Sequence, residues 1–212
     1  MNKNLNLEEI FASAVKNHQK NNLTEAIDLY QQILRSDPNN SIVNYNLALA
    51  FDKNNEILKA ISHYKETIKI DPNYLSAHFN LGIAFRELGD LEKEISCYEK
   101  TINIDPNHSK AINNLGLAFK KLGNYQKAIS YFEKATTIEP NFAEAYNNLG
   151  TILSELGDSQ RAIGSFEKAL KINPELEFTN NNLGKIYKEI GDQMKSVEYF
   201  QKSFVNRSKI DF

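Results

Sequence analysis

The stretch from Ala145 to Asp158 reads AYNNLGTILSELGD, and related copies of it recur along the chain. The copies read VNYNLALAFDKNN (43–55), AHFNLGIAFRELGD (77–90), AINNLGLAFKKLGN (111–124) and TNNNLGKIYKEIGD (179–192). In each copy the apolar residues follow a helical spacing, and the copy ends in residues typical of turns. The sequence is therefore built from an internal repeat that contains a helix.

The prolines set the period of this repeat, because all five fall 34 residues apart. They are Pro38, Pro72, Pro106, Pro140 and Pro174. A constant period of this length is the signature of stacked-repeat architectures. With each proline at position 32, six repeats cover residues 7–40, 41–74, 75–108, 109–142, 143–176 and 177–210, as a single domain after an N-terminal tail, 1–6.

Each repeat is predicted to be a pair of antiparallel helices. Position 8 holds Ala or Gly and position 20 mostly Ala, so the two helices can approach closely, and aromatic residues at position 24 fill the space between repeats. Position 15 is Asn21 and Asn55, then always Gly, which suits a left-handed residue ending the first helix. Asp or Asn follows each glycine and is expected to cap the second helix.

With this period and these positions, the chain resembles the tetratricopeptide repeat (TPR) family from residue 7 to about residue 210. The resemblance implies an all-α fold, a right-handed α-solenoid (superhelix) of antiparallel helix pairs. It also implies that the first helices of the repeats form a concave groove that binds peptides or proteins.

Position 6 carries an unbroken series of asparagines in repeats two to six, which we name the asparagine ladder. It consists of Asn46, Asn80, Asn114, Asn148 and Asn182, and position 5 adds Asn113, Asn147 and Asn181. An amide offers donors and an acceptor, so we expect the ladder to hold the N–H and C=O groups of an extended peptide. Two alternatives are a general bias toward Asn and inheritance of a family residue without present use.

The residues beside the ladder change along the chain. Tyr45 and Phe79 make the amino-terminal part of the expected groove apolar, whereas Lys110, Asn113 and Asn147 make the later part polar. We therefore expect a peptide ligand with an apolar segment at one end.

Two known binding modes of the family use specific residues at fixed repeat positions, and these can be compared with the residues of this chain. The carboxylate clamp of TPR domains that hold chaperone termini is missing, because position 5 is never Lys, position 9 is never Asn and position 6 is never Arg, and at position 2 only Lys110 fits. The ladder instead resembles that of the superhelix of O-linked N-acetylglucosamine transferase. This resemblance implies a way of holding peptide, without implying sugar transfer.

Composition and motifs argue against several other functions. The formal charge of −2 gives no field for nucleic acid or an anionic membrane, and neither a signal peptide nor a membrane span is visible, so we expect a cytoplasmic location. The four histidines lack metal-site spacing and are expected to be solvated or at the groove edge; the one cysteine, Cys97, is expected to be a packed thiol. Glu94, at position 20, is expected to extend its carboxylate to water. We predict no cofactor, no metal and no enzymatic activity.

The leading interpretation is a scaffold for protein–protein interaction that binds an extended peptide in its groove. One alternative is the substrate-recognition module of a larger glycosyltransferase, sulfotransferase or hydroxylase. Another is self-assembly, because the last hairpin carries Val197, Phe200, Phe204 and Phe212 with no capping helix after it.

Overall fold

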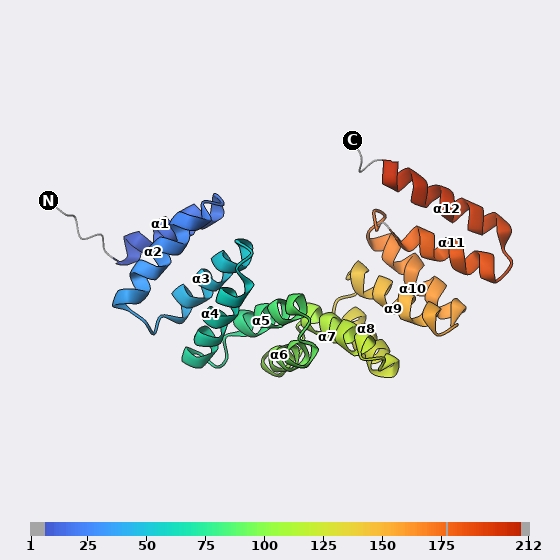
Figure 1. Cartoon of the computed structure of the whole chain (residues 1–212). Helices are drawn as coiled ribbons and strands as arrows, with labels where there is room; N and C mark the ends of the chain where they lie inside the picture. Colours follow the sequence, from blue (N-terminus) through green and yellow to red (C-terminus); the bar gives the residue numbers. More distant parts are fainter. Residues whose placement is uncertain (1–6, 177, 209–212) are drawn as a thin grey trace. The chain divides into compact units, whose positions relative to one another are not determined.

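The computed structural model describes residues 7–176 and 178–208, and all regular secondary structure in these ranges is α-helical (Figure 1). The twelve helices of the described residues form two compact units, divided between Pro106 and Asn107. The expected tail (1–6), Glu177 and Phe212 lie outside the described residues. A single domain over 7–210 stays a prediction. No described helix has the length and apolar character needed to cross a membrane.

Unit 1 contains three helical hairpins, as the first three repeats predict. Their helices are α1 (Leu7–Gln19), α2 (Leu23–Ser36), α3 (Ser41–Lys53), α4 (Ile57–Ile70), α5 (Leu75–Leu88) and α6 (Leu91–Ile104). The two helices of each hairpin pack on each other, and successive hairpins meet where α2 contacts α3 and α4 contacts α5. This order of contacts is that of an α-solenoid, in which each repeat touches its neighbours.

Unit 2 repeats the arrangement with the last three hairpins. Its helices are α7 (Ser109–Lys121), α8 (Tyr125–Ile138), α9 (Ala143–Glu155), α10 (Ser159–Ile172), α11 (Thr179–Glu189) and α12 (Gln193–Ser208). Here α8 contacts α9, and α10 contacts α11.

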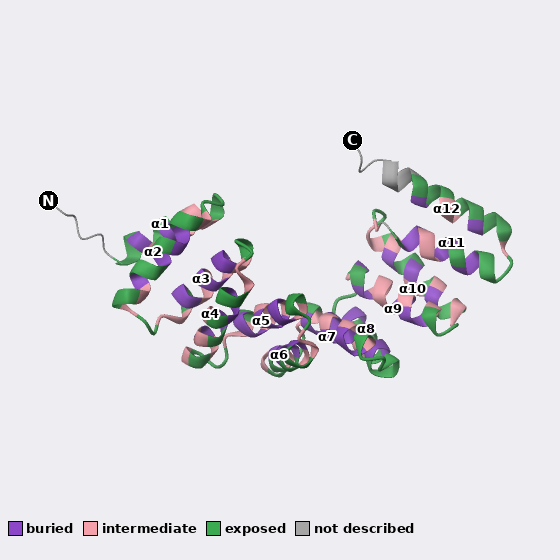
Figure 2. Ribbon diagram, viewed as in Figure 1, coloured by how far each residue is buried: buried purple, intermediate pink, exposed green. Residues whose placement is uncertain are grey.

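The interior of each hairpin forms around the aromatic residue of position 24, as the sequence predicts. Tyr30, Tyr64, Tyr98, Phe132 and Phe166 are all fully buried. Glycine at position 8 makes room for these rings, since a Cβ added to Gly150 would lie 2.7 Å from the Phe166 ring. Figure 2 shows buried residues recurring on helices of both units.

The turns within the hairpins also match the prediction. All six position-15 residues have a positive φ, including Asn21 at 64° and Asn55 at 59°. The expected caps form as well: the side chain of Asp90 accepts a hydrogen bond from the backbone N–H of Lys93, and Asn124, Asp158 and Asp192 make equivalent contacts. Local chemistry at these positions therefore fixes where each helix ends.

Two expectations for polar residues were wrong. The Glu94 side chain does not reach water, because the residue is only 1% exposed, inside the third hairpin. His78 is not solvated either: it is buried, and its Nε2 lies 3.0 Å from the carbonyl oxygen of Pro72. Cys97 is buried, as expected of a packed thiol.

Candidate functional site: the faces of the first helices

In unit 1 a ladder residue joins two successive first helices. The Asn80 Nδ2 on α5 donates a hydrogen bond to the Tyr45 hydroxyl on α3, at 2.9 Å. The Tyr45 ring is also held by other rings, with centroids 4.9 Å from Tyr74 and 6.0 Å from Tyr64. Position 6 of one repeat thus contacts position 5 of the repeat before it, an offset of 35 residues.

The same offset recurs in unit 2 with different side chains. The Asn148 Nδ2 on α9 donates to the Asn113 Oδ1 on α7, also at 2.9 Å. Asn113 is only 5% exposed, so it positions Asn148 and is not open to a ligand. The neighbouring Asn147 is engaged too, because its Oδ1 accepts a hydrogen bond from the Thr179 hydroxyl at 2.8 Å.

The ladder residues are half-buried, and their amide nitrogens are largely used within the protein. Asn46 Nδ2 donates to the Ile42 carbonyl at 2.8 Å, as Asn80 and Asn148 donate to the preceding repeat. The side-chain oxygens of these three amides have no partner among the described residues. What the structure leaves for a ligand is therefore a set of oriented acceptors.

An apolar hollow lies beside the start of the unit 1 face. It has a volume of about 260 Å³ and is lined by Leu7, Glu8, Phe11, Ile33, Asp37, Asn40, Ile42 and Val43. Sequence reasoning missed Phe11, although Phe11 occupies position 5 of the first repeat, the position of Tyr45 and Phe79 in the next two. The aromatic residues at position 5 of the first three repeats could have identified Phe11. It was overlooked because the neighbouring Ala12 interrupts the asparagine series in the first repeat.

Phe79, the other aromatic residue predicted beside the ladder, is half-buried on α5 with its ring centroid 6.0 Å from that of Tyr98. In unit 2 the corresponding surface is polar. Lys110 is exposed in the first turn of α7, and further along α7 the Lys120 ammonium pairs with Glu155 of α9 at 2.7 Å. Unit 1 therefore offers apolar surface where unit 2 offers hydrogen bonds and charge.

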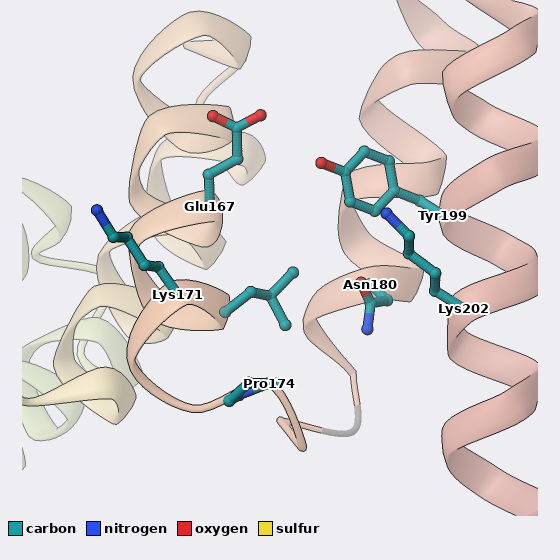
Figure 3. A pocket seen from close by; sticks show the side chains of 7 residues that line it. Glu167, Lys171, Pro174, Asn180, Tyr199 and Lys202 are labelled. Carbon is teal, nitrogen blue, oxygen red and sulfur yellow. The ribbon is translucent and has the colours of Figure 1, made fainter.

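Clefts of a second kind lie between successive second helices. One in unit 2, of about 430 Å³, is lined by residues that include Glu167, Asn180, Tyr199 and Lys202 (Figure 3). Burial, together with the Glu167 charge, raises the pKa of Tyr199. A cleft of about 810 Å³ occupies the equivalent place in unit 1, where Pro72 and Lys100 correspond to Pro174 and Lys202, and His78 stands at the repeat position of Asn180. This recurrence makes the clefts a consequence of hairpin stacking.

Histidine and cysteine side chains in the described part of the chain make structural contacts. No group of three His, Cys, Asp or Glu residues there is arranged to hold a metal ion. His63 stacks on Phe51, and His108 caps α7 by accepting from the Ala111 N–H. Burial raises the pKa of the Cys97 thiol to about 11, so the sulfur stays protonated at neutral pH.

Paired helices with a 34-residue period and outward-facing side chains on the first helices define a helical-repeat protein of the protein-binding type. Tetratricopeptide repeat models match residues 109–142, 143–176, 75–108, 179–204 and 29–62, and a TPR repeat model matches 53–89. The chain belongs to the tetratricopeptide repeat family.

Solved structures of TPR proteins share this fold. The crystal structure of MamA is 25% identical with a TM-score of 0.72, and the match covers 78% of this chain and 96% of MamA. YrrB, described as a TPR protein with an unusual peptide-binding site, is 19% identical with a TM-score of 0.69 over 84% of this chain and 92% of YrrB. Pseudomonas aeruginosa PilF is 17% identical with a TM-score of 0.79 over 91% and 88%. Among curated proteins no match was found.

Proposed function

We propose that this chain is a non-enzymatic scaffold that binds an extended peptide segment of another protein along the faces of its first helices. Membership of the TPR family and the likeness to MamA support the interaction role. The observation that carries the peptide mode is the orientation of the Asn46, Asn80 and Asn148 amides, whose nitrogens are held inside the protein while their oxygens are left as acceptors. YrrB has a described peptide-binding site on the same fold.

The proposed chemistry is the capture of peptide N–H groups. A backbone N–H of an extended chain that meets a fixed acceptor makes a hydrogen bond without ordering a new protein side chain, which lowers the entropic cost of binding. Asn46 and Asn80 supply acceptors in unit 1, and Asn114, Asn148 and Asn182 are the ladder positions of unit 2. Because backbone N–H groups are common to all sequences, the ladder gives affinity and leaves selectivity to neighbouring residues.

Selectivity in unit 1 is assigned to the apolar hollow and the aromatic residues beside the ladder. Ile42 is 54% exposed at the rim of the hollow, so it gains apolar contact when a ligand side chain enters. A large aliphatic or aromatic residue of the peptide fits this place. Lys110 and the asparagines give unit 2 a preference for polar peptide residues.

The test is selection from a displayed library of random peptides about ten residues long, the length that a ladder of this kind spans. Peptides selected on the unchanged protein are measured against a variant with Asn46, Asn80 and Asn148 changed to Ala. The matched control changes Asn39, Asn73 and Asn141, which are exposed in the turns between hairpins, to Ala. We expect at least a tenfold loss of affinity in the ladder variant only.

Stability must be measured beside affinity, because two of the ladder amides also join repeats. Losing such a hydrogen bond costs about 0.5–1.5 kcal/mol, so the ladder variant is compared at a temperature where circular dichroism shows it folded. The apolar contacts beside the ladder are tested separately with Tyr45→Phe and Phe79→Leu, which keep most of each side chain because both aromatic rings pack against others. Equal binding by the ladder variant and the control would exclude the ladder as the binding device.

A second candidate function is self-association through α12. Met194, Val197 and Phe204 on this helix are 85%, 53% and 76% exposed, an unusual density of apolar surface on one helix. Light scattering over a range of concentrations tests it, with Phe204→Glu as the disrupting variant. Phe200 is unsuitable because its ring packs against Gly184. The enzyme-module interpretation and the cytoplasmic location stay predictions.

A further inference from the structure

The hydrogen bonds between first helices fix which residues face each other further along those helices. Asn80 meets Tyr45 between α3 and α5, and Asn148 meets Asn113 between α7 and α9. Seven residues further along both helices, which is two helical turns or about 10.5 Å, another pair of residues with the same offset of 35 faces each other. In unit 2 that pair is Lys120 and Glu155, whose Nζ and Oε1 lie 2.7 Å apart.

In unit 1 the same step brings together two carboxylates, Asp52 of α3 and Glu87 of α5, which we name the acidic pair. Asp52 is half-buried, and its pKa is raised by burial and by the charge of Glu87. Among the described residues neither carboxylate forms an ion pair. The nearest basic residue in sequence, Lys53, acts instead on His18 of α1, where burial and the Lys53 charge lower the pKa of the imidazole.

A buried aromatic residue, Tyr64, packs beside Tyr45, one of the residues that set this register, with ring centroids 6.0 Å apart. Tyr64 of α4 is fully buried, and its Oη has no hydrogen-bond partner among the described residues. Burial first, and then the charges of Asp52, Tyr45 and Glu87, raise its pKa, so the hydroxyl lies within the electrostatic field of the acidic pair. The Asn80 nitrogen is also near, but its hydrogen bond goes to Tyr45 at 2.9 Å. An unpartnered buried hydroxyl is rare in folded proteins.

We propose that the acidic pair, with the Tyr64 hydroxyl beside it, binds the cationic side chain of a lysine or arginine in the extended peptide. This inference rests on the proposed function and names the second selective contact of unit 1. The ligand ammonium or guanidinium takes the place that Lys120 fills within unit 2. It relieves the repulsion between two carboxylates, and it forms charge-assisted hydrogen bonds with both.

The position of the acidic pair also sets a spacing in the ligand. Asp52 lies ten residues after Ile42 on α3, which is about 15 Å along the helix axis. An extended peptide covers that length with about five residues. A ligand that reaches both places therefore carries an apolar residue for the hollow and a basic residue at least about five positions away.

The experiment repeats the library selection on the unchanged protein and on the double variant Asp52→Asn and Glu87→Gln. A matched control, Asp28→Asn with Glu99→Gln, removes two exposed carboxylates from second helices and changes the net charge equally. We expect peptides selected on the unchanged protein to be rich in Lys or Arg at that spacing. They should bind the double variant about tenfold more weakly and the control unchanged.

The outcomes separate this inference from the proposed function. Peptides that bind unchanged protein and double variant equally, with no basic enrichment, would overturn the cation site and leave the scaffold role standing. Equal losses in the double variant and the control would show a non-specific effect of net charge and would also overturn it. If no peptide is selected on any form of the protein, both proposals fail. We expect the double variant to stay folded, because neutralising the acidic pair removes a repulsion. A weaker affinity of this variant is therefore not caused by unfolding.

Discussion

The two units have the same backbone plan, yet their equivalent positions carry different chemistry. Position 24 is Tyr in all three repeats of unit 1 and Phe in all three of unit 2. The first helices are joined by an Asn–Tyr contact in unit 1 and by an Asn–Asn contact in unit 2. Two turns further on, unit 1 has the acidic pair where unit 2 has the ion pair of Lys120 and Glu155.

This difference between the units indicates which of them has more polar groups available to a ligand. In unit 2 the polar groups facing between first helices largely satisfy each other, which stabilises the unit and reduces what they offer a ligand. In unit 1 the half-buried Asp52 and the exposed Glu87 have like charges and form no ion pair among the described residues, and the buried Tyr64 hydroxyl has no hydrogen-bond partner there. Burial of Asp52 and of the Tyr64 hydroxyl costs stability. Such unmatched groups are typical of binding sites, because a ligand supplies the missing partners.

The largest expected effect concerns the spacing of helices within hairpins. Position 8 is Ala14, Ala48 and Gly82 in unit 1 and glycine in all three repeats of unit 2, and a Cβ on Gly150 would lie 2.7 Å from Phe166. We expect Gly150→Ala to lower the free energy of unfolding by about 1–3 kcal/mol, as overpacking does. Gly164→Ala on α10 is the control, because nothing lies within 4 Å of its added Cβ. There the higher helix propensity of Ala should raise stability. Urea denaturation of both variants measures the contrast, and similar destabilisation in both would refute it.

The second-largest expected effect comes from exchanging Tyr and Phe at position 24. Phe132→Tyr buries a hydroxyl in unit 2 and is expected to cost about 1–2 kcal/mol, whereas Tyr64→Phe removes one of the two buried, unpartnered tyrosine hydroxyls in the described part of unit 1, the other being that of Tyr30, and should gain about 1 kcal/mol. Thermal unfolding followed by circular dichroism gives the sign of each change. If Tyr64→Phe destabilises the protein, the hydroxyl has a partner that the contacts do not show, and the contrast between units is lost.

Most of the fold could be predicted because each position is repeated six times. Local geometry within one hairpin decides the glycines of position 15, the aromatics of position 24 and the caps such as Asp90. Because the pattern recurs at a fixed period, a position that departs from it in one repeat does not hide it. A residue that departs from the repeat pattern in a single repeat was harder to predict. Glu94 was expected to reach water, but the close approach of α5 and α6 leaves it inside the hairpin.

The details of the candidate site could not be predicted from the period alone. The contacts that join Asn80 to Tyr45, Asn148 to Asn113 and Glu155 to Lys120 are 35 residues apart, not 34. A 34-residue alignment therefore places Asn113 beside Asn147, although Asn113 bonds to Asn148. The same offset hides the acidic pair, since Asp52 and Glu87 belong to different columns of the repeat.

A smaller effect follows from exchanging charges between the units. Asp52→Lys gives unit 1 the pair that Lys120 and Glu155 form in unit 2, and we expect it to raise stability by about 0.2–1 kcal/mol. Lys120→Asp should lower stability by a similar amount, because it opposes two carboxylates. The two variants and their combination are compared by urea denaturation at low salt, where the difference is largest. Changes of the same sign in both variants would contradict the shared register.

The smallest expected effect is a dependence of stability on pH that belongs to unit 1. Burial, and then the Glu87 charge, raise the pKa of Asp52 in the folded protein, so between its unfolded and folded pKa values the folded state binds more protons. Stability contributed by this group therefore increases as the pH falls through the raised pKa and is lost as the pH rises. Asp52→Asn should remove this increment, whereas Asp28→Asn, at an exposed residue of α2, should leave it unchanged. Urea midpoints measured from neutral pH down to about pH 4 test the difference. A profile that Asp52→Asn does not alter would mean that Asp52 is not repelled by Glu87, and unit 1 would then lose its clearest difference from unit 2.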